Sequence, residues 1–575
     1  MAIDATLAEL YGEQAVPEVR QRLDVVLAAH PPRRAKIRAL DQRDALLITY
    51  GDQFGAPGEA PLRTLDRFAR SYLDGLVSGL HILPFFPYTS DDGFSVVDYR
   101  QVDPRLGGWE DIHRLQERFL LMYDAVINHI SASSAWFAGW LNGYPRYQDF
   151  FISLPPRTDL SMVVRPRALP LLTPFVTARG QEWVWTTFSA DQIDLNYGNP
   201  AVLVEVIDVL LGYVDHGARF LRLDAIAYLW KIPGTPSIHL PQTHAVIRLL
   251  RAVLDYVAPH VMLITETNVP HAENISYFGG GADEAQMVYN FALPPLALHA
   301  VATGRVGALR EWAAGLERPG DQATFFNFLA SHDGIGLNPA RGILSPAEID
   351  ALVQRCLRHG GRVSEKNNPD GTRSVYELNI NYFDALSDPH GGEPLERQAR
   401  RFLAVHSVLL ALAGMPGIYV HSLLGSRSWQ AGVEQSGHNR SINRQKFLLE
   451  DIERELAAPG LRQMVYAGLA HMLRARAGSD AFHPYGYQTV LEAGESVFAL
   501  LRSSPEGESR VLCLANLSGE PQTARVALPA GERAGLARDL LSGGALRQAQ
   551  GGDLDISGAA AVTLQPYQVA WMQLE

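Results

Sequence analysis

The chain has 575 residues, of which 47% are hydrophobic and 19% are charged, and its formal net charge is −12. This composition is typical of a globular protein, and the length exceeds what one ordinary hydrophobic core organises, so we expect several domains or one large domain with insertions. The acidic balance, together with the lack of a basic run interleaved with aromatic residues, argues against nucleic acid as the main partner.

Two further features bear on the compartment. Cys356 and Cys513 are the only cysteines and lie far apart, which excludes a disulfide framework and a zinc site built on cysteines. The N-terminal stretch lacks a basic segment followed by an apolar one, and no apolar segment reaches membrane-spanning length. We therefore expect a cytoplasmic protein without a membrane partner, and the sequence leaves its oligomeric state open.

Eight short apolar runs recur along the chain, each followed by a helical pattern. In chain order they are residues 44–52, 79–85, 119–129, 218–225, 261–268, 284–291, 323–333 and 414–421. They do not alternate between polar and apolar residues, as is typical of strands buried on both faces. Eight such strands alternating with helices predict an α/β fold, the (β/α)8 or TIM barrel, although a doubly wound parallel sheet would give a similar pattern.

The spacing between these runs is interrupted twice. One interruption follows the third strand, and the other follows the seventh and contains a capping-box pattern from Ser345 to Glu348. From about residue 480, alternating segments joined by Gly and Pro predict an all-β domain, in which we read the Ala/Gly-rich tract 528–560 as loops and edge strands. The predicted division is a barrel built from 1–129, 200–333 and 396–479, insertions at 130–199 and 334–395, and a C-terminal β-sandwich-like domain at 480–575.

Charged residues end the fourth run. Arg222 and Asp224 are two positions apart on a strand, so their side chains point to the same side. A guanidinium beside a carboxylate keeps it ionised, and an ionised, oriented aspartate in a cavity can act as a nucleophile. A structural ion pair inside the barrel explains this strand equally well.

More polar residues end neighbouring runs. Glu266 ends the fifth run, and a retaining glycosidase requires two carboxylates that flank one bond, one as nucleophile and one as acid. The alternative for Glu266 is a carboxylate near the start of the following helix. Asp333 and His332 end the seventh run and His129 ends the third, where such groups can hold sugar hydroxyls.

Four segments resemble, in order and spacing, the signature regions of the α-amylase family of retaining enzymes that act on α-glucosides. They are DAVINH (124–129), FLRLDAIA (220–227), TETN (265–268) and ASHDG (330–334). The resemblance runs over nearly the whole chain. Four more segments are similar to the sucrose-phosphorylase branch of the family, namely HILPFFPYTSDDGFSVVDYRQVDPRLGGWEDI (81–112), RPRALPLLT (165–173), VWTTFSADQIDLNYGNP (184–200) and SINRQKF (441–447).

The resemblance implies a role for each matching residue. Asp224 corresponds to the nucleophile, Glu266 to the acid and base, and Asp333 to the residue that stabilises the transition state. The glucosyl unit is expected to be held by Asp52, His129, Arg222, His332 and Arg444. The branch implies that phosphate releases the glucosyl-enzyme as α-glucose 1-phosphate with retention, with Arg167 in the phosphate site.

The acceptor segment departs from that of the sucrose phosphorylases. Tyr376, Glu377, Leu378 and Asn379 stand where those enzymes carry a Tyr-Gln-Val-Asn type stretch, so a glutamine is replaced by a glutamate that adds a charge and removes two N–H donors. Residues 239–251 and 264–281 are most similar to the glucosylglycerate phosphorylases of the branch.

These similarities favour glucosylglycerate as the substrate. Glycerate is an anion that needs a cation, for which Arg341 is a candidate. Sucrose or sucrose 6-phosphate phosphorolysis, and an α-glucosidase or transglucosidase activity, stay open as alternatives.

We expect no cofactor and no metal, and only sugar and inorganic phosphate as partners. Many α-amylases bind calcium near the equivalent of Asn128, but phosphorylases of this branch generally do not, and we find no cluster of carboxylates with calcium-loop spacing. A non-enzymatic binding protein on the same fold is the remaining rival. Such proteins typically lack the catalytic carboxylates, and all three are present in this chain.

Overall fold

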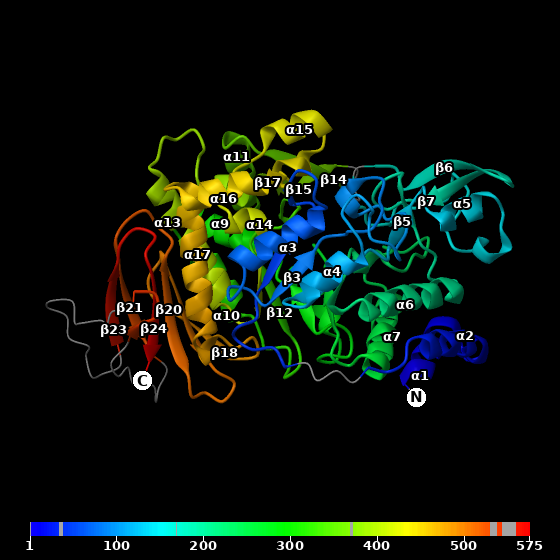
Figure 1. Ribbon diagram of the computed structural model, residues 1–575, viewed down its shortest axis with the longest axis horizontal. Coiled ribbons are helices and arrows are strands. Elements are labelled where there is room, and N and C mark those ends of the chain that lie inside the picture. The colour runs from blue at the N-terminus through cyan, green and yellow to red at the C-terminus, as the bar shows by residue number, and fades with distance from the viewer. Residues whose placement is uncertain are drawn as a thin grey trace.

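Eight parallel strands close into a barrel at the centre of the molecule (Figure 1). The computed structural model describes residues 2–33, 38–167, 169–368, 372–528, 538–542 and 559–574. The barrel strands are β1 (Leu46–Thr49), β3 (Gly79–Ile82), β4 (Leu120–Ala125), β9 (Ala218–Leu223), β10 (Met262–Thr265), β11 (Met287–Tyr289), β12 (Thr324–Phe328) and β16 (Met415–Tyr419). They coincide with the eight predicted runs, so the TIM-barrel prediction is confirmed and the doubly wound alternative is wrong.

The barrel closes between its first and last strands. β1 pairs in parallel with β3 on one side and with β16 on the other, where Leu46 meets Gly417. A Cβ atom at Gly417 would lie 2.4 Å from the ring of Phe326, so only glycine fits at this closure point. Most barrel strands are buried along their whole length, which explains why their sequences do not alternate.

Helices surround the barrel. The principal ones are α3 (Pro61–Tyr72), α4 (Trp109–Gln116), α6 (Pro200–Asp215), α7 (Pro241–Val257), α9 (Leu293–Thr303), α10 (Gly307–Ala314), α13 (Leu395–Ala411) and α17 (Leu461–Ala477). α6 begins as its sequence predicts, because Asn199 accepts a hydrogen bond from the N–H of Ala201 at 3.0 Å and Pro200 occupies the first turn. Gly217 follows the helix with φ 89°, a conformation that favours glycine.

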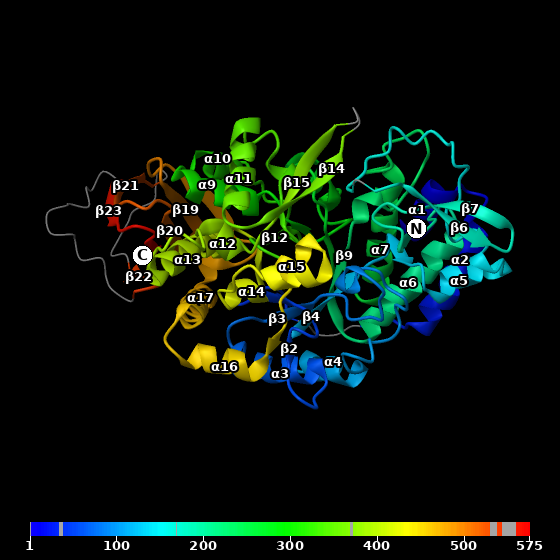
Figure 2. The same ribbon diagram turned by 90° about the horizontal axis from the view of Figure 1, so that it is seen from above.

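Two long excursions leave the barrel on the same side. Between β4 and α6 the chain forms β5 (His129–Ser131), α5 (Ala135–Leu141), β6 (Leu172–Thr177), β7 (Gly180–Trp185) and β8 (Gln192–Asp194). Between β12 and α13 it forms β13 (Ile335–Gly336), α11 (Pro346–Arg358), β14 (Arg362–Asn367), β15 (Arg373–Asn379) and α12 (Tyr382–Leu386). Ser345 and Glu348 make the predicted capping box of α11. Seen from above, α15 (Gln430–Ser436) and the β14–β15 hairpin lie over the barrel strands (Figure 2). We propose 130–199 and 334–395 as the bounds of these insertions.

The C-terminal region is a separate all-β layer, as predicted. β18 (Tyr487–Leu491), β19 (Val497–Ser503), β20 (Arg510–Asn516), β24 (Val569–Leu574) and β22 (Arg538–Asp539) form one sheet, and β21 (Gln522–Ala527) pairs with β23 (Ala559–Leu564). Buried Arg502 ties this layer to the barrel by donating to the carbonyl of Ala411 at 2.7 Å. Most of the tract 528–560 lies outside the described residues. Within the described part of the chain, no helix combines the length and apolar character needed to cross a bilayer.

Candidate active site

A cavity of about 560 Å³ opens at the C-terminal ends of the barrel strands. The residues just after β9, β10 and β12 contribute Asp224, Glu266 and Asp333 to its lining. The two insertions contribute Arg167 and Tyr376. The three carboxylates, which the sequence places at separate strand ends, therefore face one cavity.

Arg222 links the carboxylates on one side of the cavity. Its guanidinium donates to Asp124 and, at 2.9 Å, to Asp224, and it lies 3.9 Å from Glu266. Asp124 also contacts Nε2 of His81 at 2.6 Å. Although burial opposes ionisation, Arg222 and His81 lower the pKa of Asp124 to about 2. Arg222 thus keeps one permanent counter-ion and uses a second N–H contact to orient Asp224.

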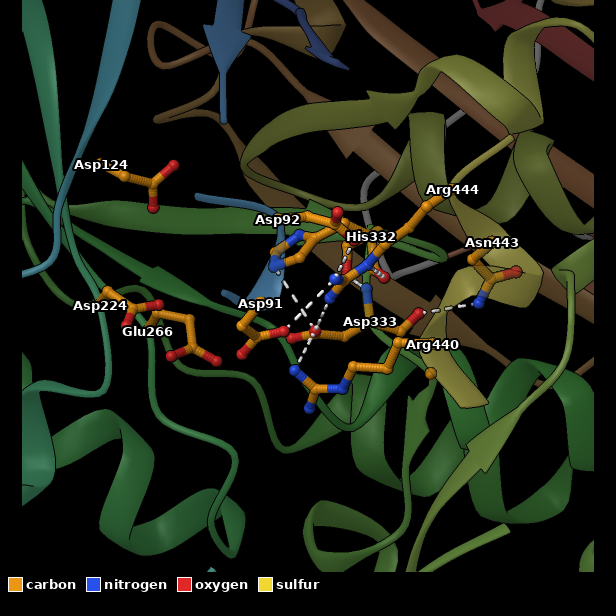
Figure 3. A network of polar contacts seen from close by, with 12 residues as sticks. Asp91, Asp92, Asp124, Asp224, Glu266, His332, Asp333, Arg440, Asn443 and Arg444 are labelled. Carbon is orange, nitrogen blue, oxygen red and sulfur yellow. Dashed lines mark hydrogen bonds and ion pairs between the residues drawn. The ribbon is translucent and has the colours of Figure 1, made fainter. Parts of the chain in front are cut away.

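Asp224 and Glu266 lie next to each other, with Asp91, Asp333 and Arg440 facing them (Figure 3). The carboxylate of Glu266 accepts a hydrogen bond from the N–H of Ala225 at 3.1 Å. Ala225 has φ 48°, in the left-handed region that residues other than glycine rarely adopt. This strained backbone immediately after Asp224 presents a donor to Glu266 and fixes the two carboxyls relative to each other.

The two carboxyls have different electrostatic surroundings. Burial raises the pKa of both Asp224 and Glu266, and Arg222 opposes the shift in each. Glu266 raises the pKa of Asp224 further, so the pair resists double ionisation and shares one proton. Because Arg222 hydrogen-bonds to Asp224 and lies farther from Glu266, the proton is more stable on Glu266. The arrangement holds one anionic nucleophile beside one acid.

Asp333 lies among cationic and imidazole groups. Its Oδ1 lies 2.5 Å from Nη1 of Arg440, 3.5 Å from Nη2 of Arg444 and 3.4 Å from Nε2 of His332. Burial, followed by the charge of Arg444, holds the pKa of His332 well below its usual value, so the imidazole is neutral at pH 7. Burial also lowers the pKa of His129, which lines the same cavity.

Arg444 holds a tight turn after β3 against the cavity. Its Nη1 lies 2.7 Å from a carboxylate oxygen of Asp92 and 3.3 Å from one of Asp91, and its Nε donates to the carbonyl of His332 at 2.9 Å. Both aspartates have left-handed backbones, with φ 49° and 51°, and Asp91 lines the cavity. Phe94 follows the turn and stacks on His332 with ring centroids 4.7 Å apart. The turn therefore presents a carboxylate and an aromatic face to a bound sugar.

The predicted site residues divide into three groups. Eight line the cavity: Asp224, Glu266, Asp333, His129, His332, Arg167, Tyr376 and Arg341. Four lie behind the residues that line it: Arg222, Arg444, Glu377 and Asn379. Asp52 is not part of the lining, and its carboxylate pairs with Nζ of Lys446 at 2.6 Å.

Sequence reasoning did not single out Asp91, Asp92 or Arg440. Asp91 and Asp92 lie in the segment 81–112 and Arg440 lies just before the segment 441–447, both of which carry the family resemblance. The signal for the first two is an acidic pair followed by glycine shortly after a barrel strand. Arg440 has no comparable local signal, because the reason for its position is a contact with Asp333, which lies in a distant part of the chain.

A buried lysine lies next to the catalytic end of the barrel. Nζ of Lys231 lies 2.8 Å from Oδ1 of Asn128 and 2.8 Å from a carboxylate oxygen of Asp194. Burial lowers the pKa of Lys231 and Asp194 opposes the shift. The ammonium provides a fixed positive charge beside Asn128. Among the described residues, no group of three or more His, Cys, Asp or Glu side chains is arranged to hold a metal ion.

Replacing Lys231 with methionine is expected to lower the free energy of unfolding by about 3–5 kcal/mol, because the carboxylate of Asp194 would be left buried without its counter-ion. Urea denaturation monitored by tryptophan fluorescence measures the change. Lys446→Met is the matched control: its pair with Asp52 is partly exposed, so a much smaller loss is expected. Equal losses in the two variants would show that burial of the Lys231 pair does not matter.

Comparison with known proteins identifies relatives over most of the chain. Residues 71–333 match the family described as the alpha amylase catalytic domain, and residues 495–572 match the D-apionate lactonase C-terminal immunoglobulin-like domain. A glucosylglycerate phosphorylase of Spirochaeta thermophila is 58% identical over 83% of this chain and 81% of its own length. The glucosylglycerate phosphorylase of Escherichia coli is 48% identical over 93% of this chain and 92% of its own length.

Sucrose phosphorylases are more distant relatives, and solved structures support the fold. The sucrose phosphorylase of Streptococcus mutans is 28% identical over 80% of this chain and 93% of its own length. The crystal structure of sucrose 6F-phosphate phosphorylase from Thermoanaerobacter thermosaccharolyticum superposes with a TM-score of 0.73 at 24% identity, covering 87% of this chain and 99% of that one. This chain therefore belongs to the α-amylase family, in the branch that contains the glucosylglycerate and sucrose phosphorylases.

Proposed function

We propose that this chain is a retaining glycoside phosphorylase that cleaves 2-O-α-glucosylglycerate with inorganic phosphate to glycerate and α-glucose 1-phosphate. The observation that carries the proposal is the carboxyl pair of Asp224 and Glu266 in a cavity that cationic side chains also line. The relatives that are 48–58% identical are named glucosylglycerate phosphorylases, which supports the same substrate.

In the first step, a carboxylate oxygen of Asp224 attacks the anomeric carbon of the glucosyl unit. The bond from that carbon to the glycerate oxygen breaks, and Glu266 gives its proton to the leaving oxygen. The product is a β-glucosyl ester of Asp224. Arg222 supports this step because its hydrogen bond keeps the attacking oxygen ionised and oriented.

In the second step, an oxygen of hydrogen phosphate attacks the same carbon from the side that glycerate has left. Glu266 takes the proton of the attacking oxygen, and the ester bond to Asp224 breaks. Two inversions give net retention. Because glycerate and phosphate occupy the same side of the glucosyl unit in turn, one set of cations has to serve both anions.

The glucosyl unit would be held by groups at several strand ends. Asp91, His129, His332 and Asp333 line the same cavity as the carboxyl pair. An oxocarbenium-like transition state is stabilised by fixed carboxylates and by donors to the sugar hydroxyls. Asp333 can fill the first role because Arg440 and Arg444 hold its carboxylate in place.

The reaction is tested by phosphate release from α-glucose 1-phosphate across an acceptor panel of D-glycerate, fructose, fructose 6-phosphate, glycerol and water. Strong release with D-glycerate alone is the expected result. Release with fructose or fructose 6-phosphate instead would replace the proposal with a sucrose or sucrose 6-phosphate phosphorylase. Release in water alone would mean that the enzyme is a hydrolase.

Arg167 is proposed to bind phosphate from the first insertion. Its Nη1 donates to the phenol oxygen of Tyr376 at 2.5 Å, so both side chains are fixed at the cavity wall. Arg167→Ala is expected to lower kcat/KM for phosphate about 10- to 100-fold, since it removes charge-assisted hydrogen bonds. Hydrolysis of α-glucosyl fluoride in phosphate-free buffer measures the background reaction, which should change little.

Arg157 in the same insertion provides the control for Arg167. Its side chain is exposed and does not line the cavity, so Arg157→Ala should leave phosphate use unchanged. If Arg167→Ala reduced hydrolysis as much as phosphorolysis, the phosphate assignment would have to be abandoned.

Both cysteines are free buried thiols, which fits a reducing compartment, and we propose a cytoplasmic location on that ground.

A further inference from the structure

Glu377 is buried behind the cavity wall and surrounded by donors. One carboxylate oxygen accepts hydrogen bonds from the N–H of Gly334 at 3.0 Å, the amide of Asn379 at 2.6 Å and Nε of Arg440 at 3.1 Å. The other accepts from Nη2 of Arg440 at 2.7 Å. The side chain is 1% exposed and does not line the cavity, so it has no free surface for an acceptor. Its effect on the reaction must act through a neighbour.

That neighbour is Arg440, in the short helix η6 (Asn439–Asn443). Glu377 binds its guanidinium through two parallel hydrogen bonds, a geometry that fixes both position and plane. A glutamine could accept only one of these two hydrogen bonds, because the NH2 group of its amide would face the other guanidinium N–H. The carboxylate at position 377 is therefore matched to an arginine at position 440.

Arg440 itself lines the cavity. Its Nη1 lies 2.5 Å from Asp333. Burial raises the pKa of Tyr376, the partner of Arg167, to about 12, and the charge of Arg440 is among those that oppose this rise. A guanidinium has five N–H groups, of which two donate to Glu377, and Nη1 is ion-paired with Asp333. Within the described residues no further side-chain or backbone acceptor contacts the remaining N–H groups. A bound anion in the cavity can take them.

We propose that Glu377 is a positioning residue that fixes Arg440 as the inner cation of the acceptor subsite, and that this fixed cation makes the enzyme prefer an anionic acceptor to a neutral one. The proposal rests on the proposed function, because glycerate and phosphate are both anions. Arg440 then lies on the inner side of the bound anion and Arg167 on the outer side. Asp333 and Glu377 hold the inner cation in one orientation before the acceptor arrives.

A purely structural role for the pair makes a different prediction. If Glu377 and Arg440 only braced the loop that carries Asp333, their loss would impair every reaction of the glucosyl-enzyme alike. If they select the acceptor, their loss would impair anionic acceptors and spare neutral ones. Glycerol separates the two cases, because it has the carbon skeleton of glycerate with a hydroxymethyl group in place of the carboxylate.

The experiment measures glucosyl transfer from α-glucosyl fluoride, without phosphate, to D-glycerate, to glycerol and to water. In Glu377→Gln, kcat/KM for D-glycerate is expected to fall at least about 10-fold while transfer to glycerol and water changes little. Arg440→Lys keeps the charge but loses the paired hydrogen bonds and disturbs the contact with Asp333, so transfer to all three acceptors should fall, and kcat/KM for D-glycerate should fall at least about 10-fold further than that for glycerol. In the double variant the preference for D-glycerate over glycerol should fall no further than in either single variant, since both changes remove one contact.

A second Glu–Arg pair supplies the matched control. Glu393 binds Arg401 through two hydrogen bonds of 2.6 Å each, and neither residue lines the cavity. Glu393→Gln should leave the preference for D-glycerate over glycerol intact. Thermal unfolding of each variant checks that it folds, and Arg440→Lys decides the question if Glu377→Gln does not fold.

Three results would overturn the inference. They are equal losses with D-glycerate and glycerol, an unchanged preference in both single variants, or additive losses in the double variant. The proposed function fails separately, if the wild-type enzyme releases no phosphate from α-glucose 1-phosphate with D-glycerate. The preference is measured without phosphate, so each idea can fail while the other survives.

Discussion

Asp224→Asn is expected to lower turnover of glucosylglycerate by at least about 10⁴-fold, because the glucosyl ester cannot form on an amide. The same variant is expected to be more stable than the wild-type protein at neutral pH, by on the order of 1 kcal/mol in the free energy of unfolding. The second effect follows from the surroundings of Asp224, which is buried beside Glu266.

The sign follows from the direction of the pKa shift. Burial raises the pKa of both Asp224 and Glu266 above their values in the unfolded chain, so the folded pair keeps one proton, on Glu266, at pH values where the unfolded chain has released both. As the pH rises above about 4, the folded state therefore loses stability until the pH passes the raised pKa of the pair. Asparagine at position 224 removes one of the two charges, so Glu266 ionises without that repulsion and the loss is smaller in the variant. The variant should gain more over wild type at pH 8 than at pH 5.

Urea denaturation at the two pH values measures this difference. Asp384→Asn is the matched control, because Asp384 is buried outside the cavity and bound by Arg427 at 2.7 Å. That variant should lose stability and keep its activity, the reverse of the result at Asp224. An Asp224→Asn protein that retains substantial turnover would not be compatible with a nucleophilic role for this residue.

Glu266→Gln is expected to lower turnover of glucosylglycerate about 10³-fold, because the glycerate oxygen would have to leave without a proton. Formation of the glucosyl-enzyme from α-glucosyl fluoride should persist, since fluoride leaves without protonation. In phosphate-free buffer the intermediate should then accumulate, because no base remains to activate water. Intact-protein mass spectrometry detects it as the mass of one glucosyl unit.

Two further measurements separate the acid and base role of Glu266 from a structural one. Azide is an anion that attacks without a base, so it should release the intermediate of the variant as α-glucosyl azide. Burial raises the pKa of Glu266, so the rate of the wild-type first step with glucosylglycerate should fall as the pH rises through that pKa. With α-glucosyl fluoride, the rate of the variant should show no such fall. Glu284→Gln is the control, because Glu284 lies outside the cavity, and this variant should behave as wild type. A Glu266→Gln enzyme that forms no covalent intermediate would contradict the acid and base role of Glu266.

The parts of the site that could be predicted are those encoded locally. Asp224, Glu266 and Asp333 each follow a buried strand, and the barrel brings such positions together whatever the loops do. The pairings of Glu377 with Arg440 and of Lys231 with Asp194 join distant parts of the chain, and nothing in either local sequence specifies its partner.

Asp52 shows most clearly what the position of a residue at a strand end does not determine. It follows the first barrel strand as Asp224 follows the fourth, yet its carboxylate pairs with Lys446 and does not reach the cavity. The cavity carboxylate comes from Asp91, on a turn whose left-handed backbone and contact with Arg444 hold it in place. Strand position predicts which end of the barrel a residue occupies, and loop geometry decides whether its side chain lines the cavity.

The pairing of β1 with β16 determines the earliest point during synthesis at which the barrel can close. The first strand ends at Thr49 and its last partner at Tyr419, so the ring cannot be completed until the ribosome has made nearly three quarters of the chain. At about 5–20 residues per second this takes roughly 20–80 s, during which the outer edge of β1 has no strand to pair with. A nascent chain of this protein would therefore expose an unpaired strand edge for much of its synthesis, which is the period when a chaperone that shields such edges would matter most.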